Sequence, residues 1–94
     1  MTAELRRLHA VIYGRVQGVG FRYFVARCAD GEPVTGWVRN RPDGAVEVLA
    51  EGPEPVLQTL LARMEQGPSG ARVSRVDSDW AGASGQHAGF EIRL

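Results

Sequence analysis

The chain has 94 residues, of which 44% are hydrophobic and 23% are charged. These proportions exclude a disordered chain, and the length predicts one folded domain over residues 1–94. Eleven basic and eleven acidic side chains give a formal net charge of zero. A duplex-binding domain usually has a basic excess, because contacts with phosphate supply much of its affinity, so we expect no nucleic-acid partner.

Cysteine usage and hydropathy indicate the compartment. Cys28 is the only cysteine, so no internal disulfide can form, and no segment is long enough to span a bilayer. The sequence therefore favours a cytoplasmic protein without a membrane partner, and we expect a monomer. His9 and His87 are too scattered to form a ligand cluster with the one thiol, which argues against zinc.

The first predicted element is a strand at Leu8–Tyr13, which has alternating faces. A glycine-rich loop over 14–20 follows it. The next apolar residues recur with helical spacing and predict an amphipathic helix that ends near Asp30-Gly31. This spacing makes Cys28 a core residue rather than a nucleophile. The expected buried stripe consists of Phe21, Phe24, Val25 and Cys28.

A hairpin is predicted next, from strands at Val34–Asn40 and Ala45–Glu51 joined by Arg41-Pro42-Asp43-Gly44. Proline presets one φ angle of such a turn, aspartate bonds to the local backbone, and glycine accepts a positive φ. The second strand alternates between small apolar residues and others, which predicts that one of its faces is buried. That face would hold Val46, Val48 and Ala50, opposite Glu47, Leu49 and Glu51.

A second helix is predicted after Gly52-Pro53, because proline is tolerated in the first turn of a helix, and it should end at Gly67-Pro68. Its expected buried stripe is Leu57, Leu60, Leu61 and Met64. Two final strands are predicted at Val73–Trp80 and Phe90–Arg93, separated by a segment rich in Gly, Ser and Ala over 81–89.

The predicted order is therefore β-α-β-β-α-β with one more strand at the C-terminus. This order indicates the α+β class, as a ferredoxin-like split βαβ sandwich with an antiparallel sheet and two helices on one face. Because this fold hosts many unrelated functions, the function must be argued from the site.

The stretch Gly14-Arg15-Val16-Gln17-Gly18-Val19-Gly20-Phe21-Arg22 lies between a predicted strand and a predicted helix. Glycines at such a junction let backbone N–H groups turn inwards and form an anion-binding nest. The first turn of the helix adds unpaired N–H groups and the positive end of its dipole. Arg22 can direct its guanidinium to the same place, so the stretch predicts a site for a phosphoryl group.

Known phosphate motifs narrow this prediction. The glycines are not followed by Gly-Lys-Ser/Thr, so the loop is not that of a nucleoside triphosphatase. Tyr23 stands where a dinucleotide-binding fingerprint has its third glycine. A tight connection from strand to helix also needs glycine, so the loop by itself leaves a purely structural role open.

Two stretches together resemble a known family. The loop from Gly14 to Arg22 and the segment Gly36-Trp37-Val38-Arg39-Asn40-Arg41-Pro42-Asp43-Gly44 are similar to the two signature stretches of the acylphosphatases. The similarity extends over nearly the whole chain and agrees with the predicted element order. The segment Asp30-Gly31-Glu32-Pro33-Val34 departs from the family, which leaves the end of the first helix uncertain but not the site.

The resemblance implies hydrolysis of acyl phosphates to a carboxylate and inorganic phosphate, without a metal or an organic cofactor. It implies that Arg22 binds the phosphate and that Asn40 positions the attacking water. Inorganic phosphate would then be both a product and a competitive inhibitor. The substrate-binding loop would consist of Arg15, Val16, Gln17, Gly18, Val19 and Gly20, with the contribution of Arg15 expected from its backbone.

Two other functions are compatible with the same fold. RNA-recognition modules share the element order, but they carry stacking aromatics on the third strand. Here that strand, Ala45–Glu51, has no aromatic residue and two carboxylates. The second alternative is a phosphate-binding domain without turnover, of the kind that occurs within larger hydrogenase-maturation proteins. The presence of both Arg22 and Asn40 favours the enzyme over this alternative.

Overall fold

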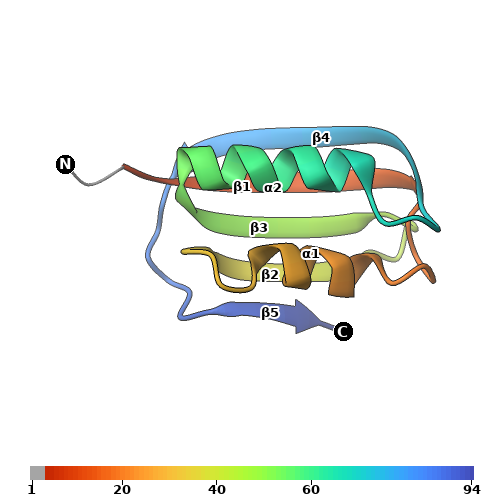
Figure 1. Cartoon of the computed structure of the whole chain (residues 1–94), viewed down its shortest axis with the longest axis horizontal. Coiled ribbons are helices and arrows are strands. Elements are labelled where there is room, and N and C mark those ends of the chain that lie inside the picture. The colour runs from red at the N-terminus through yellow and green to blue at the C-terminus, as the bar shows by residue number, and fades with distance from the viewer. Residues whose placement is uncertain (1–3) are drawn as a thin grey trace.

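A computed structural model of the chain describes residues 4–94 and has the predicted order of elements (Figure 1). Residues 1–3 of the expected domain 1–94 lie outside the described residues. The order confirms the predicted α+β ferredoxin-like class. The elements are β1 (Leu5–Arg15), α1 (Phe21–Ala29), β2 (Thr35–Asn40), β3 (Val46–Pro53), α2 (Glu54–Gln66), β4 (Arg72–Gly82) and β5 (Phe90–Arg93).

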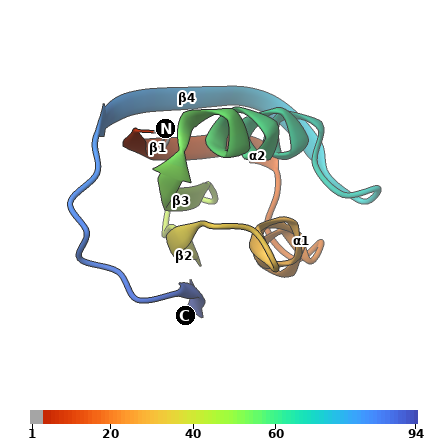
Figure 2. The same ribbon diagram turned by 60° about the vertical axis from the view of Figure 1, so that its left-hand side comes forward.

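The sheet has the strand order β4-β1-β3-β2-β5, and its first four strands pair antiparallel. The prediction of a wholly antiparallel sheet is wrong at one edge, because β5 pairs parallel with β2. The segment 83–89 explains this direction. It carries the chain from the last residue of β4 across one end of the sheet to the opposite edge (Figure 2). From that end β5 can only run alongside β2 in the same direction.

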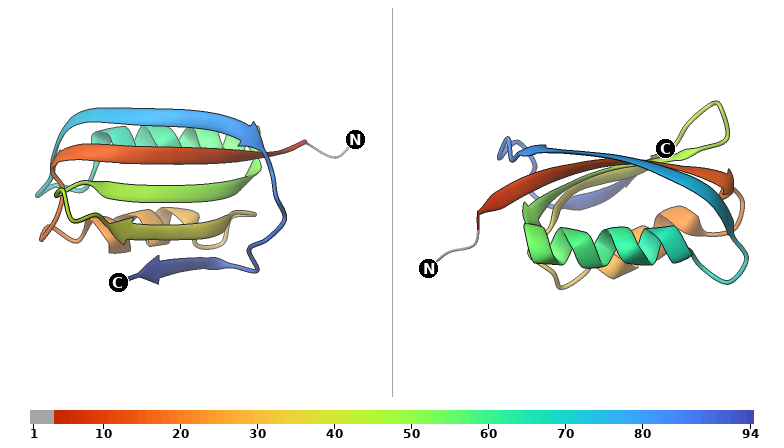
Figure 3. Two further views of the ribbon diagram at one scale, coloured as in Figure 1. Left: turned by 180° about the vertical axis from the view of Figure 1, so that it is seen from behind. Right: turned by 90° about the horizontal axis from the view of Figure 1, so that it is seen from above.

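Both helices cover one face of the sheet, and the other face has no helix over it (Figure 3, right). The covered face holds the core, as the alternation of residues along β1 and β3 predicts. On β1, Leu8, Ala10 and Ile12 are fully buried. On β3, the buried partners are Val46, Val48 and Ala50.

The buried stripe of α1 is shifted from the predicted one. Phe21, Val25 and Ala29 are buried, whereas Phe24 and Cys28 are only half-buried. The helix therefore turns its i, i+4, i+8 row to the sheet, and the other two side chains pack at the margin of the core. On α2, Leu57, Leu60 and Met64 are buried as predicted, and Leu61 is half-buried.

The other face of β3 is also buried, contrary to the prediction of one buried face. Glu47 and Glu51 are only 9% and 4% exposed. Burial of a carboxylate requires partners, and both have them. Glu47 contacts the His9 ring and the Arg39 guanidinium, each at 2.6 Å. Glu51 accepts hydrogen bonds from the Ser84 and Gly85 backbone N–H groups and from the Ser84 hydroxyl, at 2.8–3.0 Å.

Neither helix within residues 4–94 has the length and hydropathy that crossing a bilayer would need.

Candidate active site

The loop that joins β1 to α1 is shorter than predicted. Gly14 and Arg15 belong to β1, where they pair with Val73 and Arg72 of β4. The connecting loop is therefore residues 16–20. Two of its glycines, Gly18 and Gly20, have φ angles of 75° and 77°. This left-handed backbone is accessible to glycine without strain, and it turns the chain sharply into the helix.

The start of α1 is suited to an anion. Gly20 is the N-cap and supplies no side-chain hydrogen bond, and the first turn contains no acidic residue. The first N–H groups of the helix are therefore left without a side-chain cap, and the positive end of the dipole is not neutralised within the helix. An anion at this position would accept hydrogen bonds from these N–H groups and would neutralise the positive end of the dipole.

A cavity of about 150 Å³ lies at this loop. It brings together Arg22 from the first turn of α1 and Asn40 from the end of β2, two residues that are 18 positions apart in sequence. Figure 1 shows why they meet, since the β1–α1 loop and the β2–β3 hairpin lie at the same end of the molecule. The full lining is Val16, Gly18, Gly20, Phe21, Arg22, Tyr23 and Asn40.

The Arg22 side chain is held in place by the last strand. Its Nη1 donates a hydrogen bond of 3.0 Å to the backbone carbonyl of Arg93. Arg22 has no salt bridge among residues 4–94, so its remaining N–H donors are not committed to a carboxylate. A guanidinium that is oriented by a neutral carbonyl keeps its full charge for a phosphate.

The other predicted loop residues divide into two groups. Val16, Gly18 and Gly20 line the cavity, whereas Arg15, Gln17 and Val19 do not. The Arg15 side chain is exposed on β1, and Val19 packs against the core. The Gln17 amide has partners of its own, because its Nε2 donates to the Arg41 carbonyl at 2.8 Å and to the Ala45 carbonyl at 3.0 Å.

Two lining residues were not predicted as site residues. Phe21 is buried and lines the cavity, and the periodicity of the sequence identified it only as core. Tyr23 is 67% exposed, which is unusual for a large aromatic side chain. Its position beside Arg22 in the first turn, off the apolar stripe of the helix, is a sequence signal that could have indicated it.

The lining contains no carboxylate, imidazole or thiol. Two carboxyl groups have altered pKa values, but both lie on β3 outside the cavity. Burial raises the pKa of Glu47, but hydrogen bonds and charges from His9 and Arg39 outweigh it, so the pKa is lowered. Burial likewise raises the pKa of Glu51, and the hydrogen bonds from Ser84 and Gly85 outweigh it, so this pKa is also lowered.

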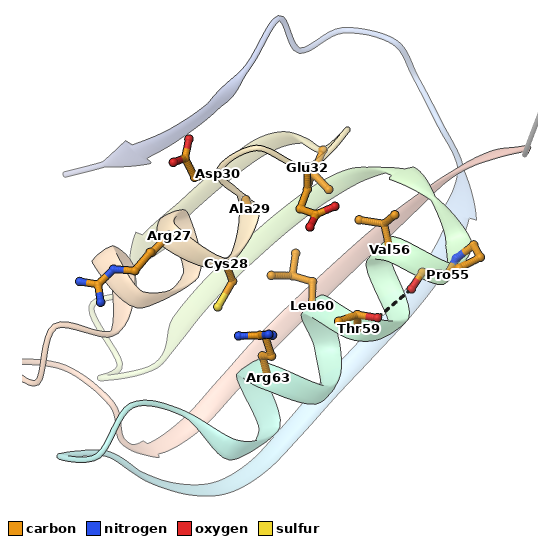
Figure 4. Close-up of a pocket in the computed structure, with 11 residues that line it drawn as sticks. Arg27, Cys28, Ala29, Asp30, Glu32, Pro55, Val56, Thr59, Leu60 and Arg63 are labelled. Atoms are coloured by element: carbon orange, nitrogen blue, oxygen red, sulfur yellow. Dashed lines mark hydrogen bonds between the residues drawn. The ribbon is translucent and has the colours of Figure 1, made fainter.

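A larger cavity of about 480 Å³ lies between α1 and α2 (Figure 4). It is lined in part by the half-buried Cys28. Cys28 was predicted to lie within the core, but it lies at the margin of the core. Its charged residues, however, are of both signs, with Arg27 and Arg63 opposed by Asp30 and Glu32. In Figure 4 the Arg27 side chain extends away from Cys28, so Arg27 and Arg63 do not direct their charges to one place in this cavity. The loop cavity, whose only charged side chain is an arginine, is the better anion site.

Fold and cavity together define the class, which is a ferredoxin-like α+β domain with a glycine-rich loop and a helix start without a side-chain cap beside a cavity that contains an arginine. Comparison with known proteins agrees, because the acylphosphatase family model matches residues 8–92. The chain belongs to the acylphosphatase family, whose members are hydrolases.

The similarity extends to single proteins. An acylphosphatase of Salinibacter ruber is 49% identical over 98% of this chain and 97% of its own length. The crystal structure of an acylphosphatase from Bacillus subtilis superposes with a TM-score of 0.90, at 40% identity over 95% of this chain and 99% of that one. Full-length HypF shares the fold over 100% of this chain but only 12% of its own, at 22% identity and a TM-score of 0.86.

Proposed function

We propose that the protein hydrolyses the carboxyl–phosphate bond of acyl phosphates, that Arg22 and the backbone of the 16–20 loop hold the phosphoryl group, and that Asn40 positions the attacking water. The observation that carries this proposal is the shared cavity of Arg22 and Asn40. One residue is a cation at a helix start, and the other is a neutral amide that can bind a water by both donating and accepting.

The proposed reaction needs little from the protein besides charge and position. The water oxygen forms a bond to phosphorus while the bond from phosphorus to the acyl oxygen breaks, and its electron pair leaves with the carboxylate. Arg22 and the loop N–H groups stabilise the charge on the other phosphoryl oxygens. The lining offers no side chain that would serve as a general base. A phosphoryl oxygen therefore takes the proton of the water, which gives inorganic phosphate.

The proposal extends to inhibition by the product and to the state in which the protein acts. We propose that inorganic phosphate binds where the phosphoryl group does and so acts as a competitive inhibitor. We propose a monomer that acts in the cytoplasm, without a metal ion and without nucleic acid. The net charge of zero supports the absence of a nucleic-acid partner, and the single cysteine supports the cytoplasm.

The first test is hydrolysis of benzoyl phosphate by the purified protein with a chelator present. Arg22→Ala should lower kcat/KM by at least about 10²–10³-fold, as the loss of a preorganised donor to a reacting oxyanion does. Asn40→Ala should lose turnover but still bind inorganic phosphate, measured by calorimetry. Arg27→Ala is the matched control, because this arginine is exposed on the same helix and lies outside the loop cavity.

Each alternative has its own outcome in this experiment. Phosphate binding by a folded protein that shows no turnover would favour the binding domain without activity. Salt-dependent binding of mixed oligonucleotides, with no hydrolysis, would favour an RNA-binding module. Activity that survives in Arg22→Ala would contradict the proposed site.

A further inference from the structure

The loop that lines the phosphoryl site and the hairpin that carries Asn40 are not neighbours in the sheet. The loop leaves β1 and the hairpin joins β2 to β3, and the strand order places β3 between β1 and β2. Backbone pairing therefore fixes β1 against β3 and β3 against β2, but no strand pair joins the loop directly to the end of β2. The sheet relates the two only through β3, where Ile12 and Asn40 both pair with Val46, and a contact made by the loop itself would hold it directly to the hairpin.

Gln17 makes that contact. Its Nε2 donates to the carbonyl of Arg41 at 2.8 Å and to the carbonyl of Ala45 at 3.0 Å. These two residues stand at the two ends of the turn, directly after Asn40 and directly before β3. A primary amide has two N–H groups on one nitrogen, so one side chain can bind both arms of the hairpin.

The hairpin does not depend on Gln17 for its own shape. The Arg41 N–H already donates to the Ala45 carbonyl at 2.8 Å, and the Gly44 N–H donates to the Arg41 carbonyl at 3.1 Å. Each carbonyl has a second lone pair, and Gln17 occupies it. The turn therefore has its own hydrogen bonds without Gln17. The contribution of the Gln17 side chain is to fix the position of the turn relative to the loop.

We propose that Gln17 is a positioning residue that holds Asn40 at the working distance from the phosphoryl group. The Gln17 side chain does so by binding the hairpin to the loop, and this side chain does not contact the substrate, because it lies outside the cavity lining. The proposal rests on the function proposed above for Asn40. It gives a further reason for glutamine at this place, since glutamate would direct an acceptor at two carbonyl oxygens.

The test separates positioning from binding. Gln17→Met keeps the length of the side chain and removes both donors. We expect kcat for benzoyl phosphate to fall by about 10- to 100-fold, as small misplacements of a reacting group do. The affinity for inorganic phosphate should change by less than about threefold, because Arg22 and the loop N–H groups remain. Gln58→Met, at an exposed position on α2, is the matched control and should keep full activity.

A double-mutant cycle makes the test specific for Asn40. If Gln17 acts through Asn40, Gln17→Met should lower the residual turnover of Asn40→Ala by less than about twofold. Equal losses in both backgrounds would overturn the proposal, and so would lost phosphate binding in Gln17→Met. If the Met variant does not fold, Gln17→Ala, which also removes both donors and adds no charge, carries the same cycle.

The outcomes also distinguish this proposal from the one on which it rests. Full turnover in Asn40→Ala would overturn the role of Asn40, and the role of Gln17 with it. An inactive Asn40→Ala beside a fully active Gln17→Met would overturn the role of Gln17 alone.

Discussion

Gly14 shows how one residue of a motif can serve the fold rather than the ligand. Its φ angle is 125°, and a Cβ atom there would lie 2.1 Å from the Arg72 carbonyl oxygen and 2.8 Å from the Ser74 nitrogen. The pairing of β1 with β4 shifts register between Tyr13 and Gly14, which brings the two backbones this close. The glycine is required by the close approach of β4, two residues before the loop begins.

We therefore predict that Gly14→Ala destabilises the protein by about 2 kcal/mol or more, because the β4 backbone cannot retreat without losing its pairing with β1. The measurement is the free energy of unfolding from urea titration. Gly82→Ala is the matched control, since a Cβ atom at that glycine of β4 would meet nothing within 4 Å. Similar free energies of unfolding for the two variants would contradict the prediction.

At the scale of elements, the strand β5 connects the edge of the sheet to the candidate site. It pairs with β2 in a register that sets Arg93 beside Arg39, next to Asn40. The carbonyl of Arg93 accepts the hydrogen bond from Arg22. The Arg93 side chain lies instead over the Trp37 ring, with 4.9 Å between the guanidinium carbon and the ring centroid. The backbone of β5, rather than its side chain, therefore reaches the site.

We predict that deletion of residues 93–94 weakens the binding of inorganic phosphate by about tenfold, the effect of losing one hydrogen bond to a charged group. Arg93→Ala should bind phosphate nearly as well as the unchanged protein, because it keeps the carbonyl. Calorimetric titration of both proteins measures the difference. The prediction is wrong if Arg93→Ala loses as much affinity as the deletion.

The sequence predicted the elements well where local pattern decides them. Alternation on β1 and β3 and the apolar stripe of α2 reflect contacts with one covering layer, so they can be read without the fold. The parallel pairing of β5 could not be predicted, because it depends on the path of 83–89 across the sheet. The burial of Glu51 depends on the same segment, since its partners Ser84 and Gly85 lie 33 and 34 residues away.

The candidate site was predicted in its composition but not in its shape. Strand, glycines and helix start are local features, and they indicated an anion site at the loop where the structure has a cavity. Figure 3 (left) shows that this loop and the hairpin lie at one end of the sheet, which only the topology can establish. The direction of the Gln17 side chain likewise depends on two carbonyls that are 24 and 28 residues away.

For the molecule as a whole, the face of the sheet without helices buries two carboxylates, Glu47 against His9 and Arg39 and Glu51 against Ser84 and Gly85. Both carboxyl groups have a pKa below the ordinary value of 4.5. A lowered pKa means that the folded state binds the proton less tightly than the unfolded state. The stabilisation is therefore complete above pH 4.5 and is lost as the pH falls through the lower pKa values of the folded state.

We predict that the free energy of unfolding, measured by urea titration from about pH 7 to about pH 3, decreases in acid and that Glu51→Gln weakens this dependence. At neutral pH this variant should be less stable by about 1–3 kcal/mol, because an amide replaces a buried carboxylate that accepts three hydrogen bonds. The gap from the unchanged protein should close in acid, where Glu51 itself becomes neutral. Glu65→Gln, at an exposed position on α2, is the control. A gap that stayed constant across the titration would mean that Glu51 stabilises the crossing segment by packing rather than by charge.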